Sequence, residues 1–362
     1  MFHNEDYDDH ERLLCINDQQ SGLRALVAVH STALGPAGGG CRVWNYPSSK
    51  EALSDVLRLS RGMSYKNAVA GLPMGGGKAV ILGPVAADQR LRVFEAFAQV
   101  VNSLGGDYVT AEDVGVSVAD MKLVASHSPF VSGVSEAGGA GGDPSPYTAL
   151  GVRLGIEAAV MHAFGRKSIE GLRIAVQGLG GVGGNLAREL SERGARLFVS
   201  DIDPAKVESV CDQYAAVPVA ADDILSQDVD VVAPCALGST ITERVAHTIS
   251  ARLIAGGANN QLANRKVGGI LLQRGIAYAP DYVVNAGGII MVSAEYFGTN
   301  DRQSVRSAIE RIFERTFELL ERADKTRRFS GDVADDIARE TISTAKSNAA
   351  ERRASQLANA EN

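Results

Sequence analysis

The spacing of apolar residues alternates between strand-like and helix-like periods along the first third of the chain. The apolar run RALVAVH at residues 24–30 predicts a strand, and residues 51–63 place apolar side chains at helical spacing. A buried strand KAVIL at residues 78–82, a helix over residues 90–104 and a strand YVTAED at residues 108–113 follow. This succession predicts an α/β domain.

The second half repeats this alternation with a stronger signal for parallel strands. Compact apolar segments separated by helical stretches predict a doubly wound parallel sheet. The segments are LRIAVQ (172–177), RLFVSDID (196–203), VDVVAP (229–234) and RLIAGG (252–257). From about residue 301 onward the charged chain has the periodicity of two amphipathic helices.

The chain has 362 residues, which is enough for two domains that each bury a core. Composition changes at residues 133–146, where GVSEAGGAGGDPSP is rich in glycine and proline. We therefore expect a first α/β domain over residues 1–142 and a second, doubly wound domain over residues 143–330.

Charge and cysteine content narrow the functional classes. The chain has 36 lysine and arginine residues against 43 acidic residues, and it has no long basic run. Nucleic acid is therefore not an expected partner, and we expect small molecules instead. No apolar run approaches the length of a membrane span, and the acidic N-terminus lacks the pattern of a signal peptide. The four cysteines are too scattered for a zinc site or a disulfide framework. We expect a cytoplasmic protein without a metal.

A glycine-rich turn in the second half predicts a dinucleotide site. The pattern G-x-G-x-x-G follows an apolar strand and opens a helix, and Asp201 comes 23 residues after its first glycine, at the end of the next strand. The helix N-terminus favours the pyrophosphate, and the Asp201 carboxylate binds ribose hydroxyls and repels a 2′-phosphate, which predicts NAD. The alternative is a tight glycine turn with a capping aspartate. The predicted cofactor-binding residues are Gly178, Leu179, Gly180, Gly181, Val182, Gly183 and Asp201.

The stretch GLPMGGGKA at residues 71–79 resembles a phosphate-binding loop but lacks two of its parts. Leu72 stands where the first glycine of a Walker loop belongs, and Ala79 lacks the hydroxyl that binds magnesium. The glycines instead allow a close approach of backbone to Lys78 in apolar surroundings.

Two lysines and an aspartate form the candidate chemistry. A charged Lys66 suits a substrate carboxylate, whereas burial beside another cation would favour the neutral amine of Lys78, the form that acts as a base. Asp113 would exchange protons with a leaving amine. In the alternative interpretation Lys66 caps a helix, Lys78 is solvated at a turn, and Asp113 caps the next helix.

Several long motifs resemble the glutamate/leucine/phenylalanine/valine dehydrogenase family over most of the chain, from about residue 34 to residue 298. They are MSYKNAVAGLPMGGGKAVI, TAEDVG, GGDPSPYTALGV, VQGLGGVGG, APCALG, GGANNQLA and APDYVVNAGGII. The resemblance implies oxidative deamination of an L-amino acid by NAD to a 2-oxo acid, ammonia and NADH. It also implies two domains that close over a cleft, a first domain that carries the catalysis and the substrate, C-terminal helices (about 331–362) that pack back on it, and homo-oligomers.

The same resemblance assigns roles to individual residues. Lys66 binds the α-carboxylate, Lys78 activates water and Asp113 relays protons. Thr148 and Asn260 match positions that line the nicotinamide and the substrate. The residues predicted to bind substrate are Lys66, Gly38, Gly39, Ala111, Asn260, Ile289 and Val292.

The residues expected around the side chain of the substrate favour an aliphatic amino acid. Ala111 and Val292 match leucine and valine dehydrogenases, and Ile289 narrows the same space. Gly38 opposes this, because it opens volume where leucine enzymes carry leucine, while Met74 is interpreted as ordinary core. We expect leucine and its branched relatives as substrates, with L-phenylalanine as the alternative.

Two other functional classes compete with this one. A regulatory protein could keep the nucleotide fold without turnover, but the presence of Lys66, Lys78 and Asp113 argues against it. A 2-hydroxy-acid dehydrogenase usually needs a histidine base, and the motifs quoted contain none.

Overall fold

The chain divides into two compact units, each with its own sheet. The computed structural model describes residues 2–134 and 139–360, with side chains up to residue 351. Unit 1 comprises Met1–Gly142, Val292–Asp301 and Ile337–Asn362, and unit 2 comprises Asp143–Met291 and Arg302–Asp336. Part of the glycine-rich connection at 133–146 lies outside the described residues.

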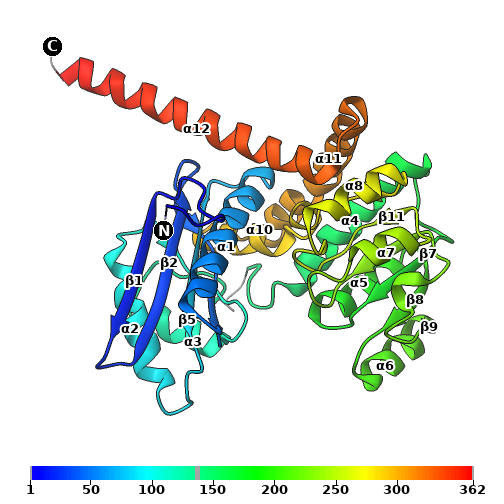
Figure 1. The fold of residues 1–362 in the computed structure, drawn as a ribbon, viewed down its shortest axis with the longest axis horizontal. Helices are drawn as coiled ribbons and strands as arrows, with labels where there is room; N and C mark the ends of the chain where they lie inside the picture. The colour runs from blue at the N-terminus through cyan, green and yellow to red at the C-terminus, as the bar shows by residue number, and fades with distance from the viewer. Residues whose placement is uncertain (1, 135–138, 361–362) are drawn as a thin grey trace. The chain divides into compact units, whose positions relative to one another are not determined.

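Unit 1 is built on a mixed six-stranded sheet (Figure 1). Its strands are β1 (Arg12–Asp18), β2 (Leu23–Ser31), β3 (Ala37–Gly38), β4 (Cys41–Trp44), β5 (Gly75–Leu82) and β6 (Tyr108–Val109). The order is β1-β2-β5-β3-β6, and β4 pairs with β5 beyond β3. The β1–β2 and β2–β5 pairs are antiparallel, while β5 is parallel to β3 and to β4. The gap between β3 and β4 therefore lies beside the middle of β5.

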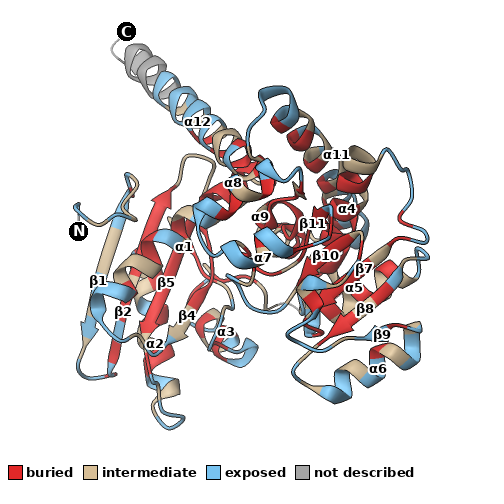
Figure 2. Ribbon diagram, turned by 45° about the vertical axis from the view of Figure 1, so that its right-hand side comes forward, coloured by how far each residue is buried: buried red, intermediate tan, exposed pale blue. Residues whose placement is uncertain are grey.

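Helices cover both faces of this sheet because the side chains of β5 alternate between two cores. Val80 packs in a cluster with Val56 and Leu57 of α1 (Ser49–Val69). Ala79 and Ile81 belong to the larger core that receives Phe94 and Phe97 of α2 (Arg90–Ser103) and Val124 of α3 (Val118–Ala125). Figure 2 shows β2 and β5 buried and β1 largely not. By the same alternation, Lys78 faces α1.

Unit 2 carries a second six-stranded sheet, and all of its strand pairs are parallel. The strands are β7 (Arg173–Gln177), β8 (Arg196–Ser200), β9 (Val217–Pro218), β10 (Val231–Pro234), β11 (Leu253–Ile254) and β12 (Ala277–Tyr278). Their order, β12-β11-β10-β7-β8-β9, reverses direction next to β7. The predicted doubly wound sheet is confirmed, and its switch point is the place where such sheets bind nucleotides.

The remaining helices follow the strands of unit 2 or extend from it. They are α4 (Ser145–Phe164), α5 (Gly181–Ser191), α6 (Pro204–Tyr214), the 3-10 turn η1 (Ile224–Ser226), α7 (Glu243–Thr248), α8 (Arg265–Gln273), α9 (Asp281–Val284), α10 (Gly287–Tyr296), α11 (Arg302–Thr326) and α12 (Ser330–Ala360). The two helices predicted beyond residue 301 are thus confirmed as α11 and α12. Residues of α10 and α12 fall in both units.

Two predicted boundaries in unit 1 are wrong. The three glycines before Lys78 belong to β5, which begins at Gly75, because they pair with β2 and β3. The strand predicted at residues 108–113 ends at Val109, so that Asp113 lies in the following loop.

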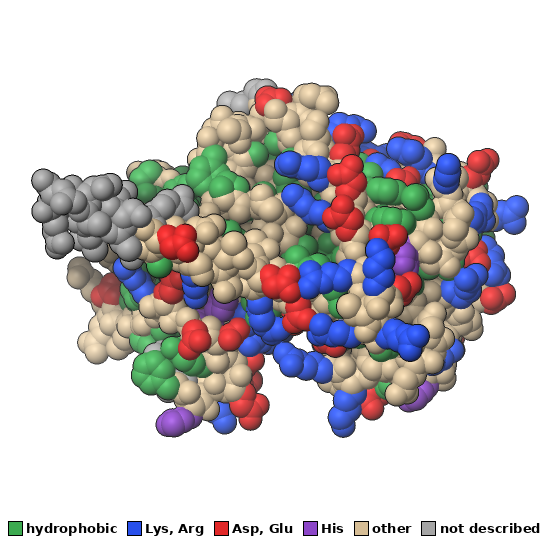
Figure 3. Space-filling model, turned by 90° about the horizontal axis from the view of Figure 1, so that it is seen from above, with side chains coloured by type: hydrophobic (Ala, Val, Ile, Leu, Met, Phe, Trp, Pro, Cys, Tyr) green, Lys and Arg blue, Asp and Glu red, His purple; other side chains and the backbone are tan. Residues whose placement is uncertain are grey.

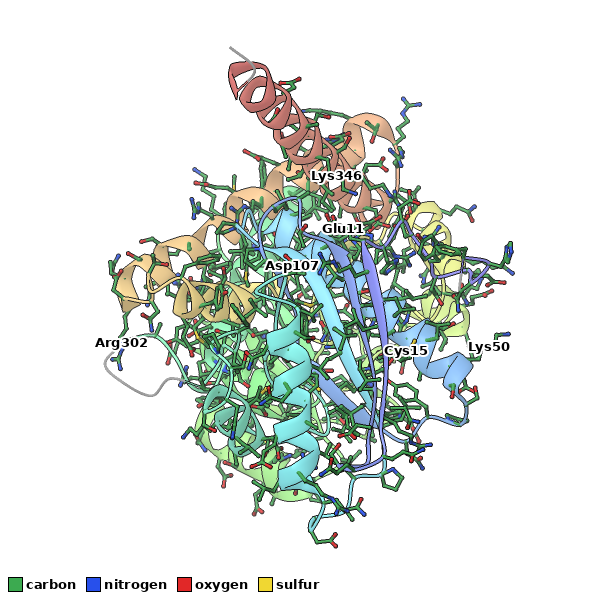
Figure 4. The ribbon with its side chains drawn as sticks, turned by 90° about the vertical axis from the view of Figure 1, so that its left-hand side faces the viewer. Glu11, Cys15, Lys50, Asp107, Arg302 and Lys346 are labelled. Carbon is green, nitrogen blue, oxygen red and sulfur yellow. The ribbon has the colours of Figure 1, made fainter. Side chains whose placement is uncertain are left out.

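The surface shows no accumulation of one charge sign on the face seen in Figure 3, where acidic and basic side chains are interspersed. Cys15, which is labelled in Figure 4, lies on β1 and is exposed. All four cysteines are free thiols. Within residues 2–134 and 139–360, no helix is long and apolar enough to cross a membrane.

Candidate functional site

Buried Lys78 and half-buried Asp113 form an ion pair in unit 1. The Nζ atom of Lys78 lies 2.9 Å from Oδ2 of Asp113, and the lysine side chain is only 6% exposed. The alternative interpretation of these residues is wrong: Lys78 is in a strand and not at a solvated turn, and the next helix, α3, is capped by Ser117 and not by Asp113. A buried amine beside a carboxylate can pass protons over a short distance.

Glycines bring the segments of this pair together. A Cβ added at Gly39 would lie 1.9 Å from the backbone oxygen of Gly77, and one added at Gly40 would lie 2.9 Å from Cβ of Asp113. Larger residues would therefore push the β3–β4 connection away from β5 and from the loop that carries Asp113. The glycines before Lys78 are confined in the same way, since a Cβ added at Gly75 would lie 1.9 Å from the Ser31 oxygen and one added at Gly76 would lie 2.0 Å from the Ser64 nitrogen.

Lys66 lies in the last turn of α1, half-buried, and the C-cap of this helix is Ala70. Since Lys78 points to the face of the sheet that α1 covers, both lysines belong to the same layer of unit 1. A lysine at a helix C-terminus is favoured by the helix dipole, so that its charge is stabilised there. This setting suits Lys66 for holding a carboxylate.

Arg42 is a site residue that the sequence motifs did not single out. Its Nε atom donates to Oδ2 of Asp113 at 2.8 Å, and its Nη1 atom lies 3.1 Å from Oδ2 of Asp55. Burial opposes ionisation of Asp113, but Lys78 and Arg42 outweigh it and hold the pKa of this carboxyl below its ordinary value. The only sequence signal was the position of Arg42 at the end of LGPAGGGCR, on the strand after the glycines.

The space beside Gly38 is filled, contrary to the predicted opening in the pocket wall. A Cβ added at Gly38 would lie 2.8 Å from Cε of Met74, which is 1% exposed. Met74 therefore supplies the apolar volume that Gly38 lacks. Ala111 is half-buried, and its backbone oxygen accepts from the Cys41 N–H at 2.8 Å.

The other predicted pocket residues are divided between the units. Val292 belongs to unit 1, where its backbone oxygen accepts from Oγ of Ser132 at 2.7 Å. Ile289, Thr148 and Asn260 belong to unit 2.

In unit 2 the glycine-rich loop has the shape that a dinucleotide needs. Gly178 has a φ of 91°, which favours glycine, and a Cβ added at Gly183 would lie 1.8 Å from the Gly178 oxygen. The loop leads into α5 at Gly181, and the first N–H groups of a helix have no partner within it. A Cβ at Gly180 would meet nothing within 4 Å, so that this side of the loop is open. These residues fit a pyrophosphate.

Asp201 follows β8 and faces this loop. Its Oδ2 accepts from the Leu179 N–H at 2.6 Å, and its Oδ1 accepts from the Asp203 N–H at 2.9 Å. Burial raises the pKa of this carboxyl, but the backbone donors, Leu179 first, outweigh burial and lower it. The carboxylate thus caps its own turn, as the alternative interpretation has it, and still has lone pairs for ribose hydroxyls.

Gly288, the neighbour of Ile289 in the chain, lies near Thr148 in unit 2, because α4 and α10 begin side by side there. A Cβ added at Gly288 would lie 2.6 Å from Oγ1 of Thr148. Asn260 has a φ of 54° and is exposed. The motifs containing them also hold a pair not predicted from sequence: Nδ2 of buried Asn285 donates to Oδ1 of Asn259 at 2.8 Å.

Family models match both parts of the chain. Residues 10–129 match the model described as Glu/Leu/Phe/Val dehydrogenase, dimerisation domain, and residues 199–348 match the one described as Glutamate/Leucine/Phenylalanine/Valine dehydrogenase. The first match contains Lys66, Lys78 and Asp113, and the second begins two residues before Asp201.

Individual relatives agree with these models. A leucine dehydrogenase of Bacillus subtilis is 47% identical, covering 87% of this chain and 87% of that protein, and one of Geobacillus stearothermophilus is 45% identical, covering 93% and 91%. The crystal structure of an L-tryptophan dehydrogenase from Nostoc punctiforme superimposes with a TM-score of 0.83 at 39% identity, covering 93% and 97%. The chain is therefore an amino-acid dehydrogenase that belongs to the glutamate/leucine/phenylalanine/valine dehydrogenase family.

Proposed function

We propose that this enzyme oxidises L-leucine and its branched relatives with NAD and water to the 2-oxo acid, ammonium and NADH, reversibly. The observation that carries the proposal is the ion pair of buried Lys78 on β5 and half-buried Asp113 on the loop after β6, with Nζ 2.9 Å from Oδ2. A buried amine and carboxylate at this distance are the acid–base groups that loss of ammonia from a carbon atom requires.

The proton steps follow from this geometry. Lys66 binds the α-carboxylate of the substrate. The α-carbon, which carries the amine, is then free to react. NAD, if held by the glycine loop and Asp201 of unit 2, would supply the hydride acceptor for this carbon. Asp113 first takes a proton from the substrate ammonium. Lys78 takes a proton from the water that adds to the C=N bond, and Asp113 then returns its proton to the departing amine. Because its pKa is lowered, Asp113 is ionised at neutral pH and can accept each proton before it passes it on.

The geometry of unit 2 supports NAD rather than NADP. The Asp201 carboxylate lies at the end of β8 beside the open loop, where the adenosine ribose of a dinucleotide is expected. The 2′-phosphate of NADP would lie close to this carboxylate, and electrostatic repulsion between the two would weaken the binding of NADP. Thr148 and Asn260 would line the nicotinamide.

Apolar groups support an aliphatic substrate. In unit 1 the wall contains Gly38, Ala111 and Val292, with Met74 in the space beside Gly38. Ile289 completes the predicted set, and none of these five offers a cation to a second carboxylate. The leucine dehydrogenases among the relatives support the same assignment. Phenylalanine is the alternative, because the flexible end of Met74 can move.

Four further features complete the proposal. The family model for residues 10–129 describes a dimerisation domain, which supports a homo-oligomer. We assign substrate binding to the first domain, residues 1–142, and NAD binding to the second, residues 143–330, although Val292–Asp301 of the second range lie in unit 1. The C-terminal helix returns to the first domain, since Nε of Arg339 in α12 donates to the Tyr65 hydroxyl at 2.9 Å. We place the enzyme in the cytoplasm.

The experiment is an assay of NADH formation with leucine, valine, isoleucine, phenylalanine and glutamate. We expect the highest kcat/KM for one of the three branched substrates and the lowest for glutamate. A tenfold preference for phenylalanine would establish the alternative substrate. NAD binding without turnover of any of the five would instead favour a regulatory protein.

A further inference from the structure

The guanidinium of Arg42 lies between two carboxylates of unit 1. On one side Nε donates to Asp113 Oδ2 at 2.8 Å; on the other, Nη1 lies 3.1 Å from Asp55 Oδ2. The side chain of Arg42 is 21% exposed, and that of Asp55 is 14% exposed. Asp55 is itself held, because it accepts from the Tyr46 hydroxyl at 2.6 Å and pairs with Arg58 at 2.8 Å. Arg42 thus ties Asp113 to helix α1.

Both cations that reach Asp113 contact the same oxygen. Oδ2 lies 2.9 Å from Nζ of Lys78 and 2.8 Å from Nε of Arg42. A carboxylate held twice through one oxygen has its rotation fixed, and the second oxygen then points to the remaining side. The Asp113 side chain is 24% exposed, and its two ion pairs leave the second oxygen, Oδ1, without a cation.

We propose that Arg42 is a positioning residue for the reaction: it holds Oδ2 of Asp113 beside Lys78 and leaves Oδ1 to exchange protons with the substrate amine. This inference rests on the proposed function. Arg42 has two tasks in it, one geometric and one electrostatic. Its planar fork joins Asp113 to Asp55, and its permanent charge keeps Asp113 ionised beside Lys78.

Two substitutions separate these tasks. Arg42→Lys keeps a cation but cannot contact both carboxylates in one plane, so that Asp113 is charged and poorly oriented. We expect kcat for the best amino acid to fall by about 10²-fold, the loss typical of misplaced reacting groups, with little change in KM. Arg42→Gln removes the charge as well. There we also expect the acid limb of the kcat/KM profile to move to higher pH, because one of the two cations that favour the carboxylate is gone.

Arg90 offers a matched control in the same unit. It also forms a two-point contact with one carboxylate, since Nε and Nη2 donate to Asp120 at 2.7 and 2.6 Å, and among the described residues no hydrogen bond or ion pair joins either residue to Asp113. Arg90→Lys should leave kcat and the pH profile unchanged. An equal loss of kcat in Arg90→Lys and Arg42→Lys would overturn the proposal, because the effect would then be a general one on folding. Normal kcat in Arg42→Lys together with an unmoved acid limb in Arg42→Gln would overturn it directly.

Asp55→Asn keeps the proposal testable if Arg42 variants do not fold. The substitution preserves shape but weakens the anchor of Arg42, and we expect a smaller fall in kcat at unchanged NAD binding. An unchanged kcat would show that the Asp55 contact does not position the site and would overturn the proposal. Wild-type enzyme inactive on all five amino acids would count against the proposed function and not against Arg42 alone.

Discussion

Gly76 of β5 packs directly on the backbone of Ser64 in α1, since a Cβ added at Gly76 would lie 2.0 Å from the Ser64 nitrogen. Each residue is two positions away from one of the lysines: Lys66 follows Ser64, and Lys78 follows Gly76. No side chain separates β5 from α1 at this contact. Lys66 and Lys78 therefore lie in the same layer of unit 1. This arrangement can be tested by filling the contact.

Gly76→Ala should destabilise the enzyme and lower its activity. The added methyl would collide with backbone, which cannot rotate away as a side chain can, and overpacking of this kind costs about 1–3 kcal/mol or more. Urea unfolding measures the loss. Gly62→Ala is the control on the same helix, because a Cβ there meets nothing within 4 Å. It should be neutral or stabilising. Equal unfolding midpoints for Gly76→Ala and wild type would contradict the packing argument.

Lys78→Ala should lower kcat by roughly 10²–10⁴-fold, the usual contribution of a positioned acid–base group. NAD binding should persist, because the cofactor-binding residues are in unit 2. Fluorescence titration with NADH and steady-state assays measure the two quantities. Lys66→Ala should instead raise the KM for the amino acid, since it removes a contact to the carboxylate. Lys50→Ala, at an exposed position on α1, is the control and should leave kcat and KM unchanged. Wild-type kcat in purified Lys78→Ala would remove this lysine from the mechanism.

Asp201→Ala should weaken NAD binding by roughly tenfold or more, because a hydrogen bond to a charged group contributes about 1.5–3 kcal/mol. The preference over NADP should also shrink as the repulsion disappears. The KM values for both cofactors check this. Asp203→Ala is a matched change two residues later, since Asp203 caps α6 through the Ala205 N–H. It should leave the cofactor ratio intact. A wild-type enzyme that already prefers NADP would refute the assignment.

Met74→Ala should shift specificity toward phenylalanine. Removal of the thioether opens the space beside Gly38, and each methylene in such a pocket changes selectivity by about 1–3 kcal/mol. The ratio of kcat/KM for phenylalanine to that for leucine should therefore rise by roughly tenfold or more. Met121→Ala creates a similar cavity in the core on the other face of the sheet, and it should leave the ratio unchanged. An equal phenylalanine-to-leucine ratio of kcat/KM in Met74→Ala and Met121→Ala would show that Met74 does not line the substrate pocket.

Acid should destabilise unit 1 through His10. Burial, partly offset by the backbone oxygen of Leu57, lowers the pKa of this imidazole to about 4 from its ordinary 6.5. Between these pH values the unfolded chain binds a proton that the folded chain does not, so that stability falls as pH decreases from about 6.5 to about 4. The loss is on the order of 3 kcal/mol.

Thermal midpoints of wild type and His10→Asn across this range measure the effect. We expect the variant to lose less stability between pH 6.5 and about 4, because its amide does not titrate. Exposed His127 is the control, and His127→Asn should follow wild type. Parallel curves for wild type and His10→Asn would assign the acid sensitivity to other groups.

Local patterns were sufficient for most of the fold. The apolar segments before Gly178 and before Asp201 are strands of a parallel sheet, because period and length distinguish a buried strand from a helix without knowledge of its neighbours. The capping box of Ser117 and Asp120 at the start of α3 is likewise local, since it depends on four consecutive residues. The predicted strand through Asp113 was too long, because strand ends depend on partners that lie elsewhere in the chain.

By itself, then, the sequence determined the two α/β units, the glycine loop with Asp201 and the identity of Lys66, Lys78 and Asp113 as candidates. These depend on residue type and short spacing. Only the tertiary structure decided that Lys78 meets Asp113, that Arg42 binds the same oxygen, and that Met74 fills the space at Gly38. Such contacts join distant segments, and they follow from strand register and from glycines that let backbones touch, which no local pattern specifies.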